Sequence, residues 1–282
     1  MVMNLDNSSP DLKLPSPKRT CTWEGYKFQL QHYKIFDFLF FLTHQTSASD
    51  NLTRKVAALI ENLGYDEYSD LLVNIKSNPE LSSKKLSSFS TYQSQMMMIR
   101  LIDNFNCYLS DILQITLKKQ PDALKSNETV KVEDILKFNN HSDLVNFLIN
   151  RKLNNLAYGG LREVEQFISS RFNIELFENE NERENMILAY EIRNINTHNR
   201  GIVNEIFLSR IGNMDHQFQF ETGKRFHTGF DEITVFANNI LEIGNRLDVS
   251  IAKKYNIKRK WFRTWDKPRK LKVASGLGEP DV

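Results

Sequence analysis

The sequence has few cysteines, no long apolar run and almost no net charge. Its two cysteines, Cys21 and Cys107, form neither a disulfide framework nor a metal-binding pattern, which is typical of a protein in the reducing cytosol. The longest apolar run, from Ile35 to Leu42, is interrupted by Asp37 and falls far short of the ~20 residues that cross a bilayer. The N-terminus carries no signal-peptide pattern. We therefore expect a cytoplasmic protein that makes no use of a membrane.

Other absences exclude common enzyme classes. The chain has no glycine-rich phosphate loop, no nucleophile elbow and no HExxH zinc motif. It also lacks an obvious set of carboxylate or Cys/His metal ligands, so we expect neither a metal nor a cofactor. A net charge of +2 over 282 residues does not by itself indicate a partner.

The sequence is rich in apolar residues at helical spacing. A hydrophobic content of 40% with 19 Phe indicates a folded protein, and the longest helical patterns run over 91–119 and 230–255. We predict a mainly α fold, a helical bundle with extra N-terminal helices and one small β-hairpin. The expected parts are a disordered arm (1–20), an N-terminal helical extension (21–85), a helical domain (86–255) and a basic aromatic tail (256–282).

Within the extension, the spacing predicts a deeply buried helix over 23–44 and a second helix over 51–63, followed by a polar connection over 78–90. The hairpin is expected over about 207–227. There the residues from Gln217 to Phe226 alternate in polarity and contain a turn signal at Thr222-Gly223.

The most informative stretch is Glu191-Ile-Arg-Asn-Ile-Asn-Thr-His-Asn-Arg-Gly201. At about 100° per residue, a helix from Glu184 separates its apolar and polar residues onto opposite arcs. The apolar arc holds Leu188, Ile192 and Ile195, and also Ile202 and Ile206 if the helix continues. The polar arc holds Arg193, Asn194, Thr197 and His198. An exposed helix face with a capping histidine is the plainer interpretation. A cation, an amide and an imidazole together, next to a glycine that admits another backbone, favour a functional site.

The string Arg193-Asn194-x-x-x-His198 resembles the motif of HEPN domains, in which an arginine is followed by a polar residue and then, four to six positions from the arginine, by a histidine. The wider string through Gly201-Ile-Val-Asn204 resembles versions in bacterial toxins, abortive-infection and anti-phage proteins. The resemblance covers roughly residues 90–255 and leaves residues 1 to about 85 without a role. It also includes Tyr108-Leu-Ser-Asp, Gly159-Gly160, Leu247-Asp248 and Lys254-Tyr255.

This resemblance implies a HEPN-like bundle and a metal-independent endoribonuclease that acts as a homodimer, with both arginines and both histidines in one composite cleft. His198 would then be the acid/base group, Arg193 the phosphate clamp and Asn194 an orienting residue. Glu191 would hold Arg193. The weaker supporting candidates are Thr197, Asn199 and Arg200. The implied partners are RNA, a second copy of the chain and an antitoxin or regulatory protein.

A basic segment with aromatic residues closes the sequence. Residues 253–272 carry ten Lys or Arg against one acid, Asp266. Such a segment can follow a phosphate backbone while its rings stack on bases, or its rings can pack back on the domain. The nucleic-acid-binding candidates are Lys258, Arg259, Lys260, Trp261, Arg263 and Trp265. Two alternatives to the ribonuclease stay open. One is a non-catalytic HEPN-like module for dimerisation or RNA binding, and the other is a regulatory helical protein that uses this tail.

Overall fold

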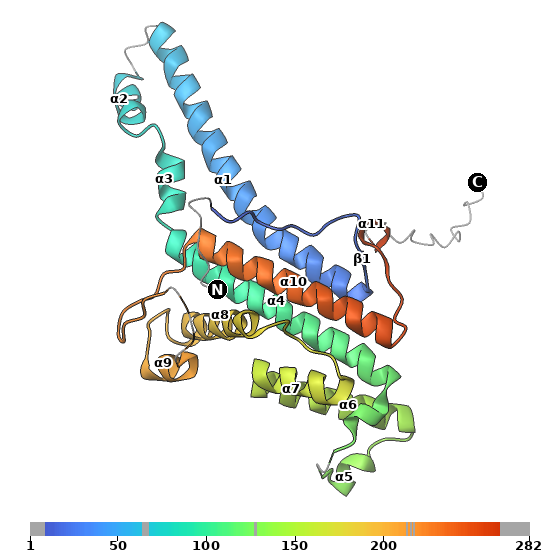
Figure 1. Cartoon of the computed structure of the whole chain (residues 1–282). Coiled ribbons are helices and arrows are strands. Elements are labelled where there is room, and N and C mark those ends of the chain that lie inside the picture. Colours follow the sequence, from blue (N-terminus) through green and yellow to red (C-terminus); the bar gives the residue numbers. More distant parts are fainter. Residues whose placement is uncertain are drawn as a thin grey trace, which may run out of the picture.

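The structure is a computed structural model, and it describes residues 9–63, 68–126, 129–212, 214, 216 and 218–265. The fold is mainly helical, as predicted (Figure 1). The elements in chain order are β1 (Thr20–Cys21), α1 (Trp23–Leu63), α2 (Ser69–Ser77), α3 (Leu81–Ser87), α4 (Ser90–Lys119), the 3-10 helix η2 (Pro121–Leu124), α5 (Val132–Ile135), α6 (His141–Gly159), α7 (Leu161–Phe172), α8 (Glu180–His198), α9 (Glu205–Ile211), α10 (Phe230–Lys254), β2 (Lys260–Trp261) and α11 (Phe262–Trp265).

Helix α4 forms the centre of the bundle. Helices α1, α6, α8 and α10 all pack against it (Figure 1). Its apolar residues recur at helical spacing and are buried, from Met97 to Leu117, and the helix ends two residues before Pro121, as the sequence predicts. The predicted helices over 91–119 and 230–255 are thus confirmed as α4 and α10.

The N-terminal helices differ from the prediction in two ways. A single helix, α1, covers the two helices expected over 23–44 and 51–63. The polar stretch between them contains no Pro or Gly, and its Asp50 accepts hydrogen bonds from the backbone N–H groups of Ser82 and Ser83, both at 2.9 Å. Asp50 thereby caps α3, which lies in the expected polar connection. The deep burial expected over 23–44 holds only for the first part of that range, where Phe28, His32 and Phe36 are buried. Beyond Phe36, α1 projects from the bundle, and Phe38 and Phe41 are exposed (Figure 1).

The expected hairpin over 207–227 is wrong as well. Residues 205–211 form α9 instead of a strand. The alternating phenylalanines pack in irregular backbone, with Phe220 lying 4.8 Å from Phe207 between ring centroids. The predicted turn at Thr222-Gly223 does form, but the backbone around it pairs with residues 201–203. Gln217 lies outside the described residues.

The sheet of the structure instead joins the two ends of the described chain. Strand β1 pairs antiparallel with β2, so that Thr20 faces Trp261. Buried Asp248 of α10 accepts hydrogen bonds from the backbone N–H and the hydroxyl of Thr22, and its carboxylate lies 3.6 Å from Arg259 Nε. Burial raises the pKa of Asp248 above its usual range. Residues 1–8 of the expected arm and 266–282 of the expected tail lie outside the described residues, and residues 9–13 run along α10 through hydrogen bonds to Asn238.

No helix among the described residues is long and apolar enough to cross a membrane.

The N-terminal half of α1 buries one histidine completely. His32 is enclosed with Phe28 and Phe36, and neither of its ring nitrogens has a hydrogen-bond partner among the described residues. Burial therefore lowers the pKa of His32 from 6.5 to about 4. The unfolded chain takes up a proton at this position below pH 6.5, whereas the folded chain does so only near pH 4.

We predict that this difference makes the protein sensitive to acid. The part of the free energy of unfolding that depends on His32 being neutral is fully present above pH 6.5 and is lost as the pH falls toward 4. It amounts to about 3 kcal/mol in the free energy of unfolding. Urea denaturation of wild type and His32→Leu at several pH values measures it, because the variant should lose less stability over this window. His44→Leu, at an exposed position of the same helix, should behave like wild type. Parallel curves for wild type and His32→Leu would contradict the prediction.

Candidate functional site

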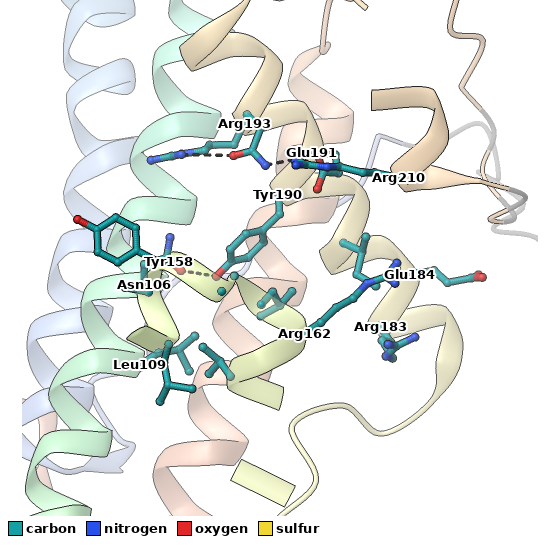
Figure 2. Close-up of a pocket in the computed structure, with 18 of the residues that line it drawn as sticks. Asn106, Leu109, Tyr158, Arg162, Arg183, Glu184, Tyr190, Glu191, Arg193 and Arg210 are labelled. Atoms are coloured by element: carbon teal, nitrogen blue, oxygen red, sulfur yellow. Dashed lines mark hydrogen bonds and ion pairs between the residues drawn. The ribbon is translucent and has the colours of Figure 1, made fainter. Parts of the chain in front are cut away.

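A cleft of about 1050 Å³ lies between α4, the junction of α6 and α7, α8 and α9 (Figure 2). Three of the predicted site residues, Glu191, Arg193 and Asn194, contribute to its wall. Further arginines line it from α7, α8 and α9, namely Arg162, Arg183 and Arg210. Its floor is apolar, with Leu109, Leu113, Leu153, Leu156 and Ile187 among the lining residues. The cleft thus combines four arginines and three glutamates, Glu180, Glu184 and Glu191, with apolar surface.

Helix α8 positions the predicted residues through its own amphipathic pattern. Asn179 begins the helix by accepting a hydrogen bond from the backbone N–H of Glu182 at 2.9 Å. Buried residues between Met186 and Ile195 then hold one side of α8 against α4 and α10. Glu191, Arg193 and Asn194 lie beside this buried side and are half-buried, whereas Thr197 and His198 are exposed.

Arg193 is held by an acid from another helix. Its Nη2 and Nε atoms donate hydrogen bonds to Asp103 Oδ1 of α4 at 2.7 and 3.2 Å. The side chain of Arg193 is 24% exposed, so the guanidinium is partly desolvated but still reaches the cleft. We expected Glu191 to hold Arg193, and the structure assigns this contact to Asp103 instead. Helical spacing within one segment gave no signal for Asp103, because α4 and α8 meet only through tertiary packing.

Asn194 and Glu191 extend this contact into a row of polar side chains. Arg193 Nη1 donates to Asn194 Oδ1 at 3.4 Å, and Asn194 Nδ2 donates to Glu191 Oε2 at the same distance. Arg210 of α9 donates to Glu191 Oε2 at 3.3 Å. Asp103, Arg193, Asn194, Glu191 and Arg210 thus form a polar row across α4, α8 and α9. Figure 2 shows Arg193, Glu191 and Arg210 of this row.

Below the polar row, Tyr190 donates a hydrogen bond to Asn106 Oδ1 at 2.5 Å (Figure 2). Burial raises the pKa of Tyr190 well above its usual value, against the opposing effect of the Arg193 cation. The phenol therefore stays protonated and acts as a donor.

His198 lies apart from this row. It is the last residue of α8, is exposed and has no hydrogen-bond or ion-pair partner among the described residues. It does not line the cleft. Thr197 is exposed, and its hydroxyl donates to the backbone oxygen of Arg193 at 2.9 Å. Within one chain, Arg193 and His198 are therefore brought onto one helix but not into contact.

The turn after His198 is sharp, so α8 does not continue to Ile202 and Ile206. The backbone N–H groups of Asn199 and Gly201 both donate to the carbonyl oxygen of Ile195, at 2.8 and 2.9 Å. Asn199 Nδ2 fixes the turn through the carbonyl oxygen of Ile202 at 2.6 Å. Arg200 is exposed with φ of 54°, and Gly201 follows with φ of 78°.

The expectation that Gly201 admits another backbone is confirmed. Its carbonyl oxygen accepts a hydrogen bond from the backbone N–H of Phe226 at 2.9 Å. A side chain at this position would bring its Cβ within 2.6 Å of Gln95 Nε2.

The predicted nucleic-acid-binding tail is divided between internal contacts and solvent. Arg259 donates to the carbonyl oxygen of Thr20, and Trp265 Nε1 donates to that of Cys21 at 3.1 Å. The Lys260 ammonium lies 4.4 Å from the centroid of the Trp265 ring. The exposed members are Lys258, Trp261 and Arg263. The sequence allowed two interpretations of this segment, and the one in which a ring packs on the domain holds for Trp265.

Among the described residues, no group of three or more His, Cys, Asp or Glu side chains is placed to hold a metal ion. Comparison with protein-family models, curated proteins and solved structures finds no match to this chain.

The contact between Asp103 and Arg193 should be measurable as an energetic coupling. A double-mutant cycle with Asp103→Ala and Arg193→Ala is expected to give about 1 kcal/mol, because both side chains are partly buried and two N–H groups are used. Glu191 and Arg210 provide the matched control. Arg210 is 56% exposed, and a coupling of ~0.5 kcal/mol or less is expected there. Urea denaturation measures both, and equal couplings for the two pairs would contradict the special role of Asp103.

Proposed function

We propose that this protein is a metal-independent endoribonuclease of the HEPN type that acts as a homodimer. The observation that carries the proposal is the placement of the Arg-Asn-x-x-x-His string on one helix. Arg193 and Asn194 lie in the wall of a cleft, and His198 is exposed about 7.5 Å further along the helix axis. The first two residues are positioned by the polar row, and the third is accessible to a partner.

Arg193 is suited to bind the scissile phosphate. Asp103 occupies its Nε and Nη2 atoms, whereas Nη1 makes only a long contact of 3.4 Å with Asn194. A phosphate oxygen can replace that contact without moving the guanidinium. A cation oriented before substrate binds stabilises the charge that develops on phosphorus oxygens at little reorganisation cost. Asp103 is therefore a positioning residue in this proposal.

His198 supplies the proton transfers. The 2′-hydroxyl of the ribose attacks the adjacent phosphorus, and the bond from phosphorus to the 5′-oxygen breaks. One imidazole accepts the proton of the 2′-hydroxyl, and another donates a proton to the leaving 5′-oxygen. The products are a 2′,3′-cyclic phosphate and a 5′-hydroxyl. Because Arg193 and His198 do not meet within one chain, a second copy packed across α8 supplies the missing half of the site.

An unrestrained ribonuclease would damage its own cell. We therefore propose a cytoplasmic toxin or anti-phage defence effector whose activity is restrained. An antitoxin could inhibit it, or a trigger or dimer assembly could be needed to switch it on. The projecting unit of α1, α2 and α3 packs outside the cleft and is available for such control.

The exposure of Lys258, Trp261 and Arg263 favours one alternative, a non-catalytic protein that holds RNA through its tail. That alternative predicts RNA binding that is lost in Trp261→Ala and a mixed RNA pool that remains intact.

The proposal predicts cleavage of a labelled mixed RNA pool in the presence of EDTA. Arg193→Ala and His198→Ala should each reduce the rate by about 100-fold or more, because each removes a group that acts in the transition state. Cyclic-phosphate ends on the products identify attack by the 2′-hydroxyl. Gel analysis of the fragments and treatment with a phosphatase that opens cyclic ends provide the measurement.

Two exposed residues outside the cleft, Arg171 and His44, serve as matched controls, and their alanine variants should cleave like wild type. Full activity in both Arg193→Ala and His198→Ala would exclude the proposed site. Cleavage products without cyclic-phosphate ends would contradict attack by the 2′-hydroxyl.

A further inference from the structure

The cleft continues well beyond the polar row. Figure 2 shows Arg193, Glu191 and Arg210 at one end and Leu109 toward the other, with Tyr158, Tyr190 and Arg162 between them. Its volume of about 1050 Å³ reaches the upper end of the ~300–1,000 Å³ typical of small-ligand pockets. A single phosphate bound at Arg193 would fill only a small part of this space.

Tyr158 is the most exposed large side chain along the cleft. It lies near the end of α6, just before Gly159-Gly160, and its side chain is 92% exposed although it lines the cleft. The ring contributes nothing to the core at this position. An exposed aromatic ring at the wall of a cleft offers a stacking surface for a planar group.

Of the four arginines that line the cleft, Arg162 is the one for which the described residues provide no ion-pair partner, since Arg210 is paired with Glu191. Arg183 is held by Glu165 and Glu180, and Arg193 by Asp103. Arg162 begins the exposed side of α7 and has no ion-pair partner among the described residues. The neighbouring backbone at Gly160 has φ of 80° and open space where a side chain would stand. Because Arg162 is exposed and lines the cleft, its guanidinium is accessible to a phosphate.

We propose that the cleft binds a single-stranded segment of RNA, with an unpaired base stacked on Tyr158 and a backbone phosphate bound by Arg162. This inference rests on the proposed function, since it extends the same substrate from Arg193 along the cleft. The apolar lining, which includes Leu109 and Ile187, offers contacts for the face of a base or the carbon atoms of a ribose. In a duplex the bases are paired and stacked on one another, so their faces are not available to Tyr158. The cleft thereby selects unpaired RNA.

Binding is tested separately from cleavage by using full-length His198→Ala protein with a fluorescein-labelled single-stranded RNA. Fluorescence anisotropy gives the dissociation constant. Adding Tyr158→Ala should weaken binding about tenfold or more, whereas Tyr158→Phe keeps the ring and should stay within about twofold. Tyr92→Ala is the matched control, because Tyr92 is exposed on α4 and does not line the cleft.

The contribution of Arg162 is read from the salt dependence. Arg162→Ala should lower the slope of log K against log salt by about 0.7, as expected for one lost contact with a single strand. Arg171→Ala, in the last turn of the same helix, should leave the slope unchanged. Circular dichroism of each variant verifies the fold.

The inference is overturned if Tyr158→Ala binds the single strand as tightly as Tyr158→Phe, or if a duplex of the same sequence binds as tightly as the single strand. Cleavage by wild type with no effect of Tyr158→Ala on binding would reject this inference and leave the proposed function standing. Binding that depends on Tyr158, without cleavage by wild type, would support this inference and count against the proposed cleavage.

Discussion

Burial of α4 is the constraint on which the rest of the structure depends. Helices α1, α6, α8 and α10 each bury an apolar face against it, so its position fixes theirs. The same helix also carries polar groups that must be satisfied where it meets its neighbours. Tyr108 donates to the carbonyl oxygen of Gly244 in α10 at 3.0 Å, and Asn104 donates to that of Phe28 in α1 at the same distance. Asp103 follows fully buried Ile102, so the placement of Arg193 is set by the register of the core.

Long, regular apolar patterns were sufficient to predict the elements that build this core. Helices α4 and α10 bury residues at three- and four-residue intervals, and nothing within them competes with that pattern. Two predictions from local patterns were wrong. A polar stretch predicted a break between two helices, and an alternating stretch predicted a β-hairpin. The polar residues around Asp50 serve α3 without interrupting α1. Phe218 and Phe220 alternate because they join an aromatic cluster with Phe226, and that contact does not require a β-ladder.

The candidate site divides in the same way. Glu191, Arg193 and Asn194 could be grouped from their spacing, because residues three and four apart share a helix face. Arg210 and Tyr158 come from α9 and α6, and only the packed bundle places them around the same cleft. It also brings Asp103 of α4 to Arg193. The tail shows a further limit. Composition gives the number of rings and charges, but whether a ring faces solvent or packs on the domain depends on tertiary contacts, such as those of Trp265 with the carbonyl oxygen of Cys21 and the ring of Trp23.

The pairing of β1 with β2 has a consequence for how the protein is made. Thr20 and Trp261 are separated by almost the whole described chain, so their contact closes a very long loop. During synthesis the N-terminal segments emerge first, and contacts of such long range form late. The strand before α1 must therefore wait until β2 has left the ribosome. A product that stops within α10 therefore has no strand to pair with Thr20.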